Sequence, residues 1–185
     1  MEIITKEEST ELLKIARNIM ERSARKEMLG KPKNYPEKLD KNFGILCILK
    51  KDSDVRGQIV VGFPVSLFSI LDATISAVTA LTSECNLLTH ELNEIKIELS
   101  ILTEPELMRF NKKEEILENI KQNIDGLLLR YGIFESFLPP QAWTEIKEKE
   151  AFLDKLCEKA GVEKETWREA DIELYKFQAQ IIEED

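Results

Sequence analysis

The chain has 185 residues, of which 26 are basic and 35 acidic, and its formal net charge is −9. A chain of this length can bury roughly 70% of the surface that its unfolded form exposes, so neither a metal nor a disulfide is needed to stabilise a fold. The acidic balance disfavours general binding to phosphate backbones, so nucleic acid is not an expected partner.

The few cysteine and histidine residues restrict the chemistry further. Cys47, Cys85 and Cys157 lie far apart, and His90 is the only histidine. A zinc site of the Cys/His type therefore has almost no residues to draw on, and we expect no metal; no motif identifies a cofactor. Unpaired thiols suit a reducing compartment, and the acidic first ten residues do not resemble a signal peptide, so we expect a cytoplasmic protein.

The first expected element is an amphipathic helix. Thr5 and Glu8 have the spacing of a capping box, and the helical pattern runs to about Met28, before Gly30. The expected core face of this helix comprises Leu12, Ile15, Ala16 and Ile19. Two strands follow at 43–51 and 55–63, joined by a short turn around residues 52–54.

The second helix follows a run that imitates a membrane span. From Ile59 to Leu81 the only charge is Asp72, but Gly62 and Pro64 interrupt the run. We therefore predict a buried strand, a turn and a buried helix, and no membrane partner. Ser66 is the expected cap of that helix, which ends near residues 82–86. Its expected core face comprises Leu67, Ile70, Leu71, Thr74 and Val78.

The second half of the chain continues the alternation of strands and helices. Residues 95–102 alternate four apolar positions inward with Lys96 and Glu98 outward, which predicts a half-buried strand. A helix over 114–122, a hairpin over 126–138 with Gly132 near its turn, and a helix over 149–160 ended by Gly161 follow. Alternation over residues 175–181 predicts a final strand. Because several strands are joined as hairpins, we predict an α+β fold of mixed, mainly antiparallel sheets with packed helices.

The stretch DVRGQIVVGFP, residues 54–64, is the best candidate for a functional feature. A glycine within a strand, here Gly57, marks a bulge or the close approach of another backbone or a ligand. The Arg56 guanidinium suits a carboxylate or phosphate, and Gln58, two residues on, is expected on the same face. These residues predict a site for a small anionic ligand or an acidic peptide end. The alternative is an internal ion pair of Arg56 with a carboxylate such as Asp72 or Glu98.

Other candidate residues carry weaker signals. Pro140, Gln141 and Trp143 follow a double proline and could line the same ligand site, although packing in the core is the more usual role of such a tryptophan. A lone histidine such as His90 is usually a surface or capping residue. No pair of carboxylates has a spacing that singles it out as a general acid and base, so no catalytic residue is identified.

Five segments, in order along the chain, resemble the AMMECR family, named after a human chromosomal region. Arg56-Gly57 followed by Gly62-Phe63-Pro64 is similar to the family's LRGCIGFP signature. IELSILTEPE at 97–106 resembles VSVLTPPE, and SFLPPQA at 136–142 resembles GLLLPQV. FLDKLCEKAGVEKETW at 152–167 and FQAQIIEE at 177–184 match the family's FL…C.KAGL…AW and F.AQVFEE patterns. These matches cover most of the chain.

The resemblance implies one AMMECR-like domain over residues 1–185, with two intimately packed α+β lobes in a cytoplasmic protein. It implies no settled reaction, although family members are encoded or fused with Memo-type and radical-SAM proteins in some microbes. The chain departs from the family at its signature, because Gln58 stands where the family has cysteine, an extra residue falls around 60–61, and the family's DPRF segment is missing. Glutamine is neither a nucleophile nor a soft metal ligand, so a thiolate mechanism at this position is excluded.

Two functions remain open. The first is a non-catalytic or accessory binding module that recognises an anionic ligand or a partner protein through Arg56, Gly57 and Gln58. The second is an enzyme or enzyme subunit in a pathway that modifies a small molecule or a macromolecule, linked to the Memo-type and radical-SAM proteins. We favour the first because the family cysteine is absent and no acid/base pair is recognisable.

Overall fold

The computed structural model describes residues 2–28, 30–52, 54–110, 112–169 and 171–184. The chain forms two compact units, one made of Met1–Glu104 with Gln180–Asp185 and the other of Pro105–Ala179. Each unit contains a four-stranded sheet, and the strand pairs within these sheets are antiparallel. The predicted α+β class is therefore confirmed.

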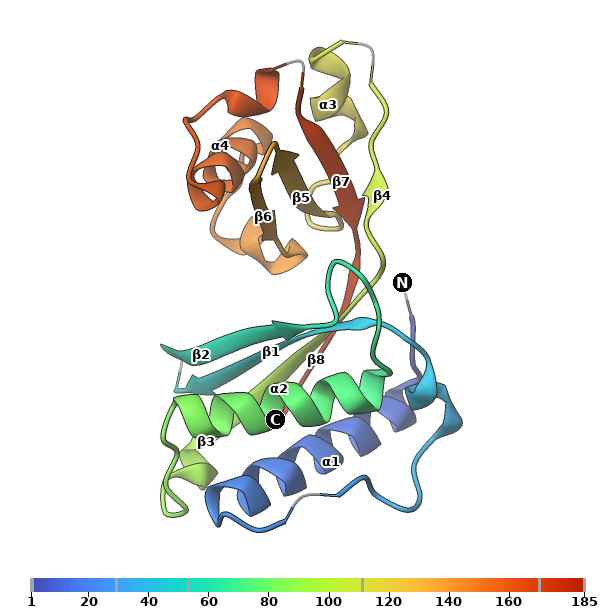
Figure 1. Ribbon diagram of the computed structural model, residues 1–185, viewed down its shortest axis with the longest axis vertical. Helices are drawn as coiled ribbons and strands as arrows, with labels where there is room; N and C mark the ends of the chain where they lie inside the picture. The colour runs from blue at the N-terminus through green and yellow to red at the C-terminus, as the bar shows by residue number, and fades with distance from the viewer. Residues whose placement is uncertain (1, 29, 53, 111, 170, 185) are drawn as a thin grey trace. The chain divides into compact units, whose positions relative to one another are not determined.

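The first unit consists of a sheet with two long helices on one of its faces (Figure 1). The sheet order is β2-β1-β3-β8, so β2 and β8 are its two edges. The strands are β1 (Gly44–Lys51), β2 (Asp54–Val61), β3 (Ile95–Leu102) and β8 (Ala179–Glu183). The helices are α1 (Lys6–Ala24) and α2 (Ile70–Glu84), with short 3-10 turns η1 (Glu37–Asp40) and η2 (Leu92–Glu94).

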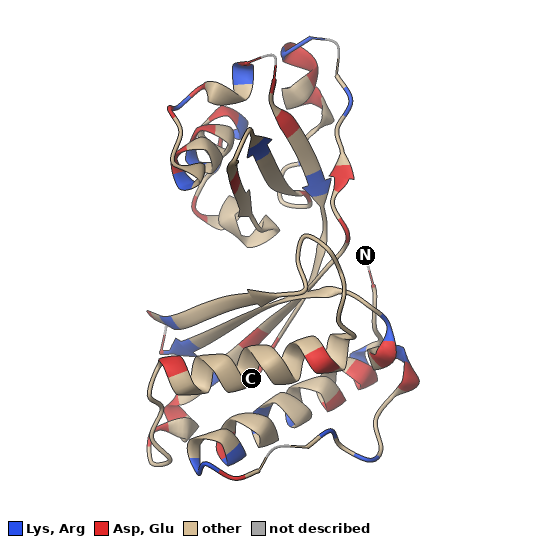
Figure 2. Ribbon diagram, in the orientation of Figure 1, with Lys and Arg blue, Asp and Glu red and all other residues tan. Residues whose placement is uncertain are grey.

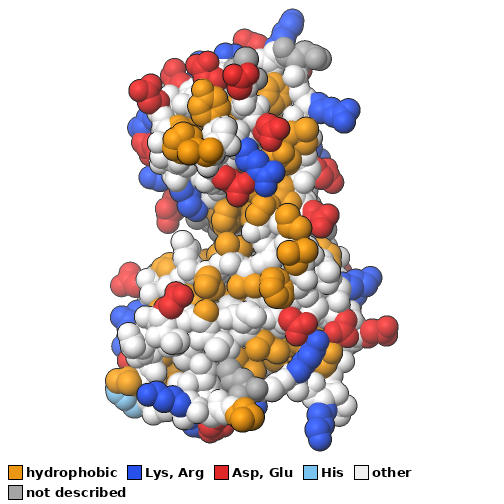
Figure 3. Space-filling model, in the orientation of Figure 1, with side chains coloured by type: hydrophobic (Ala, Val, Ile, Leu, Met, Phe, Trp, Pro, Cys, Tyr) orange, Lys and Arg blue, Asp and Glu red, His pale blue; other side chains and the backbone are white. Residues whose placement is uncertain are grey.

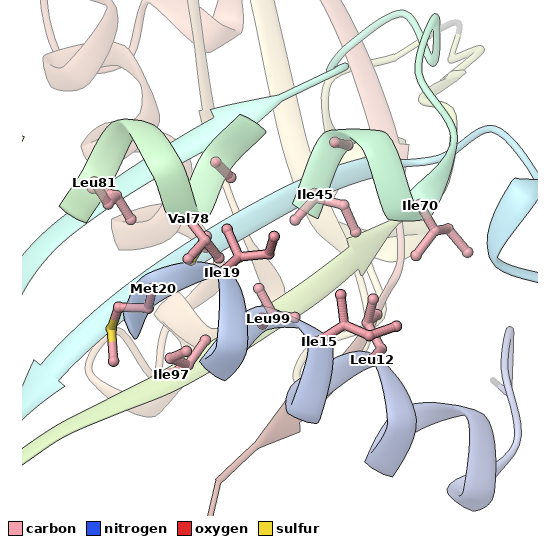
Figure 4. Close-up of a cluster of buried hydrophobic side chains, with 14 of the residues drawn as sticks. Leu12, Ile15, Ile19, Met20, Ile45, Ile70, Val78, Leu81, Ile97 and Leu99 are labelled. Carbon is pink, nitrogen blue, oxygen red and sulfur yellow. The ribbon is translucent and has the colours of Figure 1, made fainter. Parts of the chain in front are cut away.

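The core of the first unit lies between this sheet and the two helices (Figure 4). Side chains of alternate residues on β1 and β3 meet those of α1 and α2, as the two-residue period of a strand requires. All four residues predicted for the core face of α1 are buried. Buried side chains labelled in Figure 4 include Leu12, Ile15, Ile19, Met20, Ile45, Ile70, Val78, Leu81, Ile97 and Leu99.

The capping box of α1 is confirmed, but two helix boundaries differ from the predictions. Helix α1 ends at Ala24 rather than near Met28, because Lys26 adopts a left-handed φ of 57° that cannot continue a helix. The cap of α2 is Ser69 instead of Ser66, since the Ser69 hydroxyl accepts a bond from the Asp72 N–H at 3.1 Å. Consequently, Leu67, which was predicted for the core face, precedes the helix and is 75% exposed. That prediction is wrong for this residue.

Glu98 also departs from its expected environment. It lies on the face of β3 opposite the helices, as alternation predicts, yet it is only 6% exposed. The Lys50 ammonium on β1 donates to its carboxylate at 2.5 Å. A buried carboxylate needs such a partner, and the sequence pattern alone does not distinguish a paired carboxylate from a solvated one.

The second unit has the sheet order β4-β7-β5-β6. Its strands are β4 (Glu106–Leu107), β5 (Gly126–Tyr131), β6 (Phe134–Leu138) and β7 (Glu173–Phe177). Its helices are α3 (Glu114–Asn119) and α4 (Lys149–Ala160), with 3-10 turns η3 (Pro140–Thr144) and η4 (Thr166–Arg168). The hairpin with Gly132 at its turn and the helix ended by Gly161 are both confirmed, and both glycines have positive φ.

Two further expectations for this half of the chain are corrected. Helix α3 ends at Asn119 rather than near Gln122, and Ile120 already has extended backbone. The predicted final strand is two strands, β7 in the sheet of the second unit and β8 in that of the first. The alternation of apolar residues continues through both strands, so the period gives no sign that the chain changes sheets. No helix among the described residues is long and apolar enough to span a bilayer.

Candidate functional site at strand β2

Strand β2, which carries Arg56, Gly57 and Gln58, is an edge of the first sheet. It pairs with β1, and the register places Leu49 opposite Gly57 but Lys50 opposite Val55. Arg56 is therefore the additional residue of a β-bulge. A bulge re-aims a side chain, so the strict alternation behind the predicted common face of Arg56 and Gln58 is interrupted at Arg56.

Gly57 faces the last turn of α2. A Cβ atom built on Gly57 would lie 2.6 Å from the Cys85 sulfur and 3.2 Å from Leu81 Cδ2. The Cys85 thiol also donates to the Arg56 carbonyl at 3.6 Å. The close approach that the glycine predicts thus occurs, and the neighbour is the helix of the same unit.

Arg56 is half-exposed and only loosely engaged. Its side chain is 45% exposed, and Nη2 lies 4.0 Å from Oε1 of Glu91, in the segment between α2 and β3. This separation is too long for a hydrogen bond. Oε1 of Glu91 is buried, and no hydrogen bond reaches it within the described part of the chain.

The two carboxylates expected as internal partners of Arg56 are held by other cations. Asp72 lies 3.2 Å from the Lys31 ammonium, and Glu98 pairs with Lys50. The hydrogen bond from the Ser69 hydroxyl, followed by the nearby Lys31 charge, lowers the pKa of Asp72. Neither named carboxylate is therefore the partner of Arg56, and the carboxylate that approaches it, at 4.0 Å, is that of Glu91.

Gln58 lies on the face of the sheet that points away from α1 and α2, whereas Gly57 faces α2. It is opposite Ile48 on β1, and Ile48 is in turn opposite Glu98 on β3. These three side chains form a row on the face away from α1 and α2, where the Gln58 side chain is exposed.

Opposite charges surround Arg56 at this end of the sheet. Lys51 and Glu94 form an ion pair at 2.7 Å, and their hydrogen bond raises the pKa of Lys51 and lowers that of Glu94. Figure 2 shows basic residues at the tip of the β1–β2 hairpin and acidic ones in the segment after α2. Burial raises the pKa of the Cys85 thiol despite the nearby Arg56 charge, so this thiol is not an activated nucleophile.

The remaining predicted site residues belong to the second unit. Pro140 and Trp143 are buried in η3, and Gln141 is half-buried between them. The indole N–H of Trp143 donates to the Asp125 carbonyl at 2.7 Å, and its ring stacks on Phe152 with centroids 3.9 Å apart. Trp143 therefore has the packing role that the sequence offered as the alternative.

Two residues at the site were not identified from the sequence as parts of it, Glu91 and Cys85. Glu91 approaches Arg56 across 35 positions, and only the fold brings them together; no periodicity gives a signal for such a pair. The adjacent His90 is exposed. Within the described ranges, no group of three or more His, Cys, Asp or Glu side chains is arranged to hold a metal ion.

Comparison with known proteins identifies relatives along the full chain. The sequence profile of the AMMECR1 family matches residues 13–182. A protein from Methanocaldococcus jannaschii is 34% identical, and the match covers 100% of this chain and 94% of that protein. A protein from Pyrococcus furiosus is 33% identical, and the match covers 94% of this chain and 87% of that protein. The crystal structure of an uncharacterized protein from Pyrococcus horikoshii, 30% identical, superposes with a TM-score of 0.90 over 100% of this chain and 95% of that one.

Proposed function

Since the chain belongs to the AMMECR1 family, whose profile extends through both compact units, we propose that it is a non-catalytic binding module for a partner protein. Strand β2 holds an extended, acidic segment of that partner, and the Arg56 guanidinium receives a carboxylate of the segment. The observation that carries this proposal is the loosely held Arg56 on a bulge of an edge strand.

The edge of β2 supplies the backbone part of such a site. The strand has eight residues, and its outer side is not paired with another described strand. An unpaired edge offers N–H and C=O groups to an added strand, which is a common way of binding extended peptides. The bulge limits this pairing to one side of Arg56, so the expected contact is the stretch from Gly57 to Val61.

Arg56 supplies the charge preference. A carboxylate from a partner can accept two parallel bonds from the guanidinium at about 2.8 Å, which is stronger than the present 4.0 Å contact with Glu91. Basic and acidic side chains are interspersed on the face drawn in Figure 3, and the net charge is −9, so selectivity comes from this local geometry instead of a wide basic patch.

The test is binding of a set of eight-residue peptides that carry one central Glu or Asp between apolar residues, together with their Gln and Asn counterparts. Fluorescence anisotropy compares the native chain with Arg56→Ala and a matched control, Arg25→Ala. Arg25 is 53% exposed and also lies 4.0 Å from a carboxylate, that of Glu21. We expect Arg56→Ala to weaken the binding of acidic peptides about tenfold and Arg25→Ala to leave their binding unchanged.

Loss of Arg56 also removes the guanidinium that lies 4.0 Å from the buried Glu91 oxygen, so a second variant separates folding from binding. The double variant Arg56→Ala/Glu91→Gln removes both charges. It should melt near the melting temperature of the native chain and should still fail to bind the acidic peptides. If no acidic peptide binds the native chain, or if Arg56→Ala binds as well as Arg25→Ala, the proposal is wrong.

A further inference from the structure

The segment that follows β2 carries an exposed apolar surface. Residues 62–69 connect β2 to α2 (Figure 1), and the chain has no charged residue at positions 57–71. Three large apolar side chains of this segment face solvent: Val65 is 59% exposed, Leu67 75% and Phe68 44%. Apolar side chains gathered at a surface mark sites where another molecule binds. We call these three residues the apolar patch.

We propose that the partner segment at β2 also carries two adjacent apolar residues, about six positions from its acidic residue, and that these cover the apolar patch. This inference rests on the proposed function and specifies the partner further. The acidic residue meets Arg56, the residues next to it pair with the stretch from Gly57 to Val61, and the apolar pair follows beside Gly62.

The apolar patch lies directly beyond the part of β2 that pairs with the partner. Strand β2 ends at Val61, and Phe68 lies against the next residue, because a Cβ atom built on Gly62 would be 3.5 Å from Phe68 Cδ2. An added strand advances along β2 residue by residue, so the residues beyond its last pair arrive beside Gly62 and Phe68. The edge of β2 and the apolar patch therefore form one continuous surface.

Backbone hydrogen bonds hold the segment that carries the apolar patch, so the surface is formed before a partner arrives. The Phe43 N–H donates to the Phe68 carbonyl at 3.3 Å, and the Ile70 N–H donates to the Lys41 carbonyl at 2.9 Å. These bonds fix the segment to the chain that precedes β1. A preformed site loses less conformational entropy on binding, which favours this segment for recognition.

The chemistry and the size of the apolar patch favour a short apolar occupant. Since residues 62–69 carry no charge, a charged side chain bound there would lose its hydration without gaining a partner of opposite charge. The exposed parts of the three side chains amount to roughly 300 Å², whereas a stable dimer interface buries about 800 Å² on each partner. Two apolar side chains of a partner segment can cover this area, but a second copy of the chain needs a larger surface.

The probes for this proposal are the peptide TETVTVTLFT and its reversed sequence TFLTVTVTET, both with blocked ends, which place the apolar pair after or before the acidic residue. Their counterparts TETVTVTSST and TSSTVTVTET carry two serines in place of that pair. Fluorescence anisotropy measures each peptide against the native chain, Arg56→Ala and Val65→Ser/Leu67→Ser. The matched control is Ile124→Ser/Ile133→Ser, because both isoleucines are exposed and belong to the other compact unit.

We expect one of the two directions to bind the native chain about tenfold more tightly than its serine counterpart, because apolar side chains are buried only in the former. This gain should vanish in Val65→Ser/Leu67→Ser and remain in the control variant, whereas Arg56→Ala should weaken both members of the pair. The peptides TETVTLFT and TFLTVTET, in which the apolar pair is two positions closer to the acidic residue, should show no gain.

Equal binding of each peptide and its serine counterpart overturns this inference, even where Arg56→Ala weakens both and the proposed function stands. A gain that persists in Val65→Ser/Leu67→Ser or at the shorter spacing overturns it as well. If the gain depends on Val65 and Leu67 while Arg56→Ala changes nothing, the apolar contact is supported and the role proposed for Arg56 is wrong.

Sedimentation supplies the remaining outcome. A dimer of the native chain that dissociates in Val65→Ser/Leu67→Ser would identify a second copy as the occupant and refute a partner segment. Circular dichroism melts confirm that each variant is folded.

Discussion

Replacing Gly57 with alanine tests why a glycine stands in strand β2. The φ of Gly57 lies outside the left-handed region, so its backbone conformation admits alanine and only space is at issue. The added Cβ would lie 2.6 Å from the Cys85 sulfur, about 0.8 Å inside ordinary contact. Overpacking of this kind costs roughly 1–3 kcal/mol. For a chain of this size, each kcal/mol lowers the melting temperature by about 2–4 °C.

A double-mutant cycle assigns this cost to the sulfur atom. Cys85→Ala removes the sulfur and leaves Leu81 Cδ2, the end of a flexible side chain at 3.2 Å, as the nearest described neighbour of the new methyl group. In that background, Gly57→Ala should cost less than about 1 kcal/mol, so the two substitutions should couple by about 1–2 kcal/mol in urea unfolding.

Gly30→Ala is the control for glycine replacement itself. A Cβ at Gly30 meets nothing within 4 Å, and its φ is not left-handed. We expect it to be neutral or to stabilise the chain by up to about 1 kcal/mol, through the unfolded state. If Gly57→Ala is neutral as well, or costs the same with and without Cys85, then contact with α2 does not explain the glycine.

Three further substitutions test the fold around the sites. Thr5→Ala removes the capping box of α1 and should cost about 1 kcal/mol in urea unfolding; an unchanged midpoint would contradict the cap. Trp143→Phe leaves the buried Asp125 carbonyl without its indole donor and should cost roughly 1–3 kcal/mol, with no loss of peptide binding at β2. Burial raises the pKa of the Cys47 thiol to about 12, whereas the unfolded thiol ionises near pH 8.5. Its contribution to stability is therefore intact below that pH and is lost as the pH rises toward 12, so Cys47→Ala should show a smaller decline in unfolding free energy between pH 7 and 10 than the native chain; equal declines would refute the assignment.

The sequence predicted the helix ends that are set by short local motifs. Thr5 with Glu8, and Gly161 after an amphipathic run, mark helix ends within a few residues, and the structure has both. Ser66 and Ser69 offer the same capping chemistry three residues apart. The choice between them depends on where residues 62–69 leave the sheet, which is a tertiary property.

At the candidate site, too, the sequence predicted the local feature but not the residues that the fold brings to it. Gly57 signalled a close approach, and a close approach is present, but Cys85 is a neighbour only through the packing of α2 on the sheet. The Glu91 contact depends on the connection between α2 and β3, and the bulge at Arg56 on the register of the β1–β2 hairpin. Neither leaves a periodic trace in the sequence. The exchange between sheets at Gln178 was missed for the same reason.

Hydrogen exchange of the β2 amides tests the central claim most directly. The native chain and Arg56→Ala are each exchanged with and without the acidic peptide that binds the native chain most tightly. The account predicts that the peptide slows exchange of amides between Gly57 and Val61 in the native chain and does so far less in Arg56→Ala. Unchanged exchange along β2 at saturating peptide, or equal protection in the variant, would contradict recognition of an acidic segment at this edge.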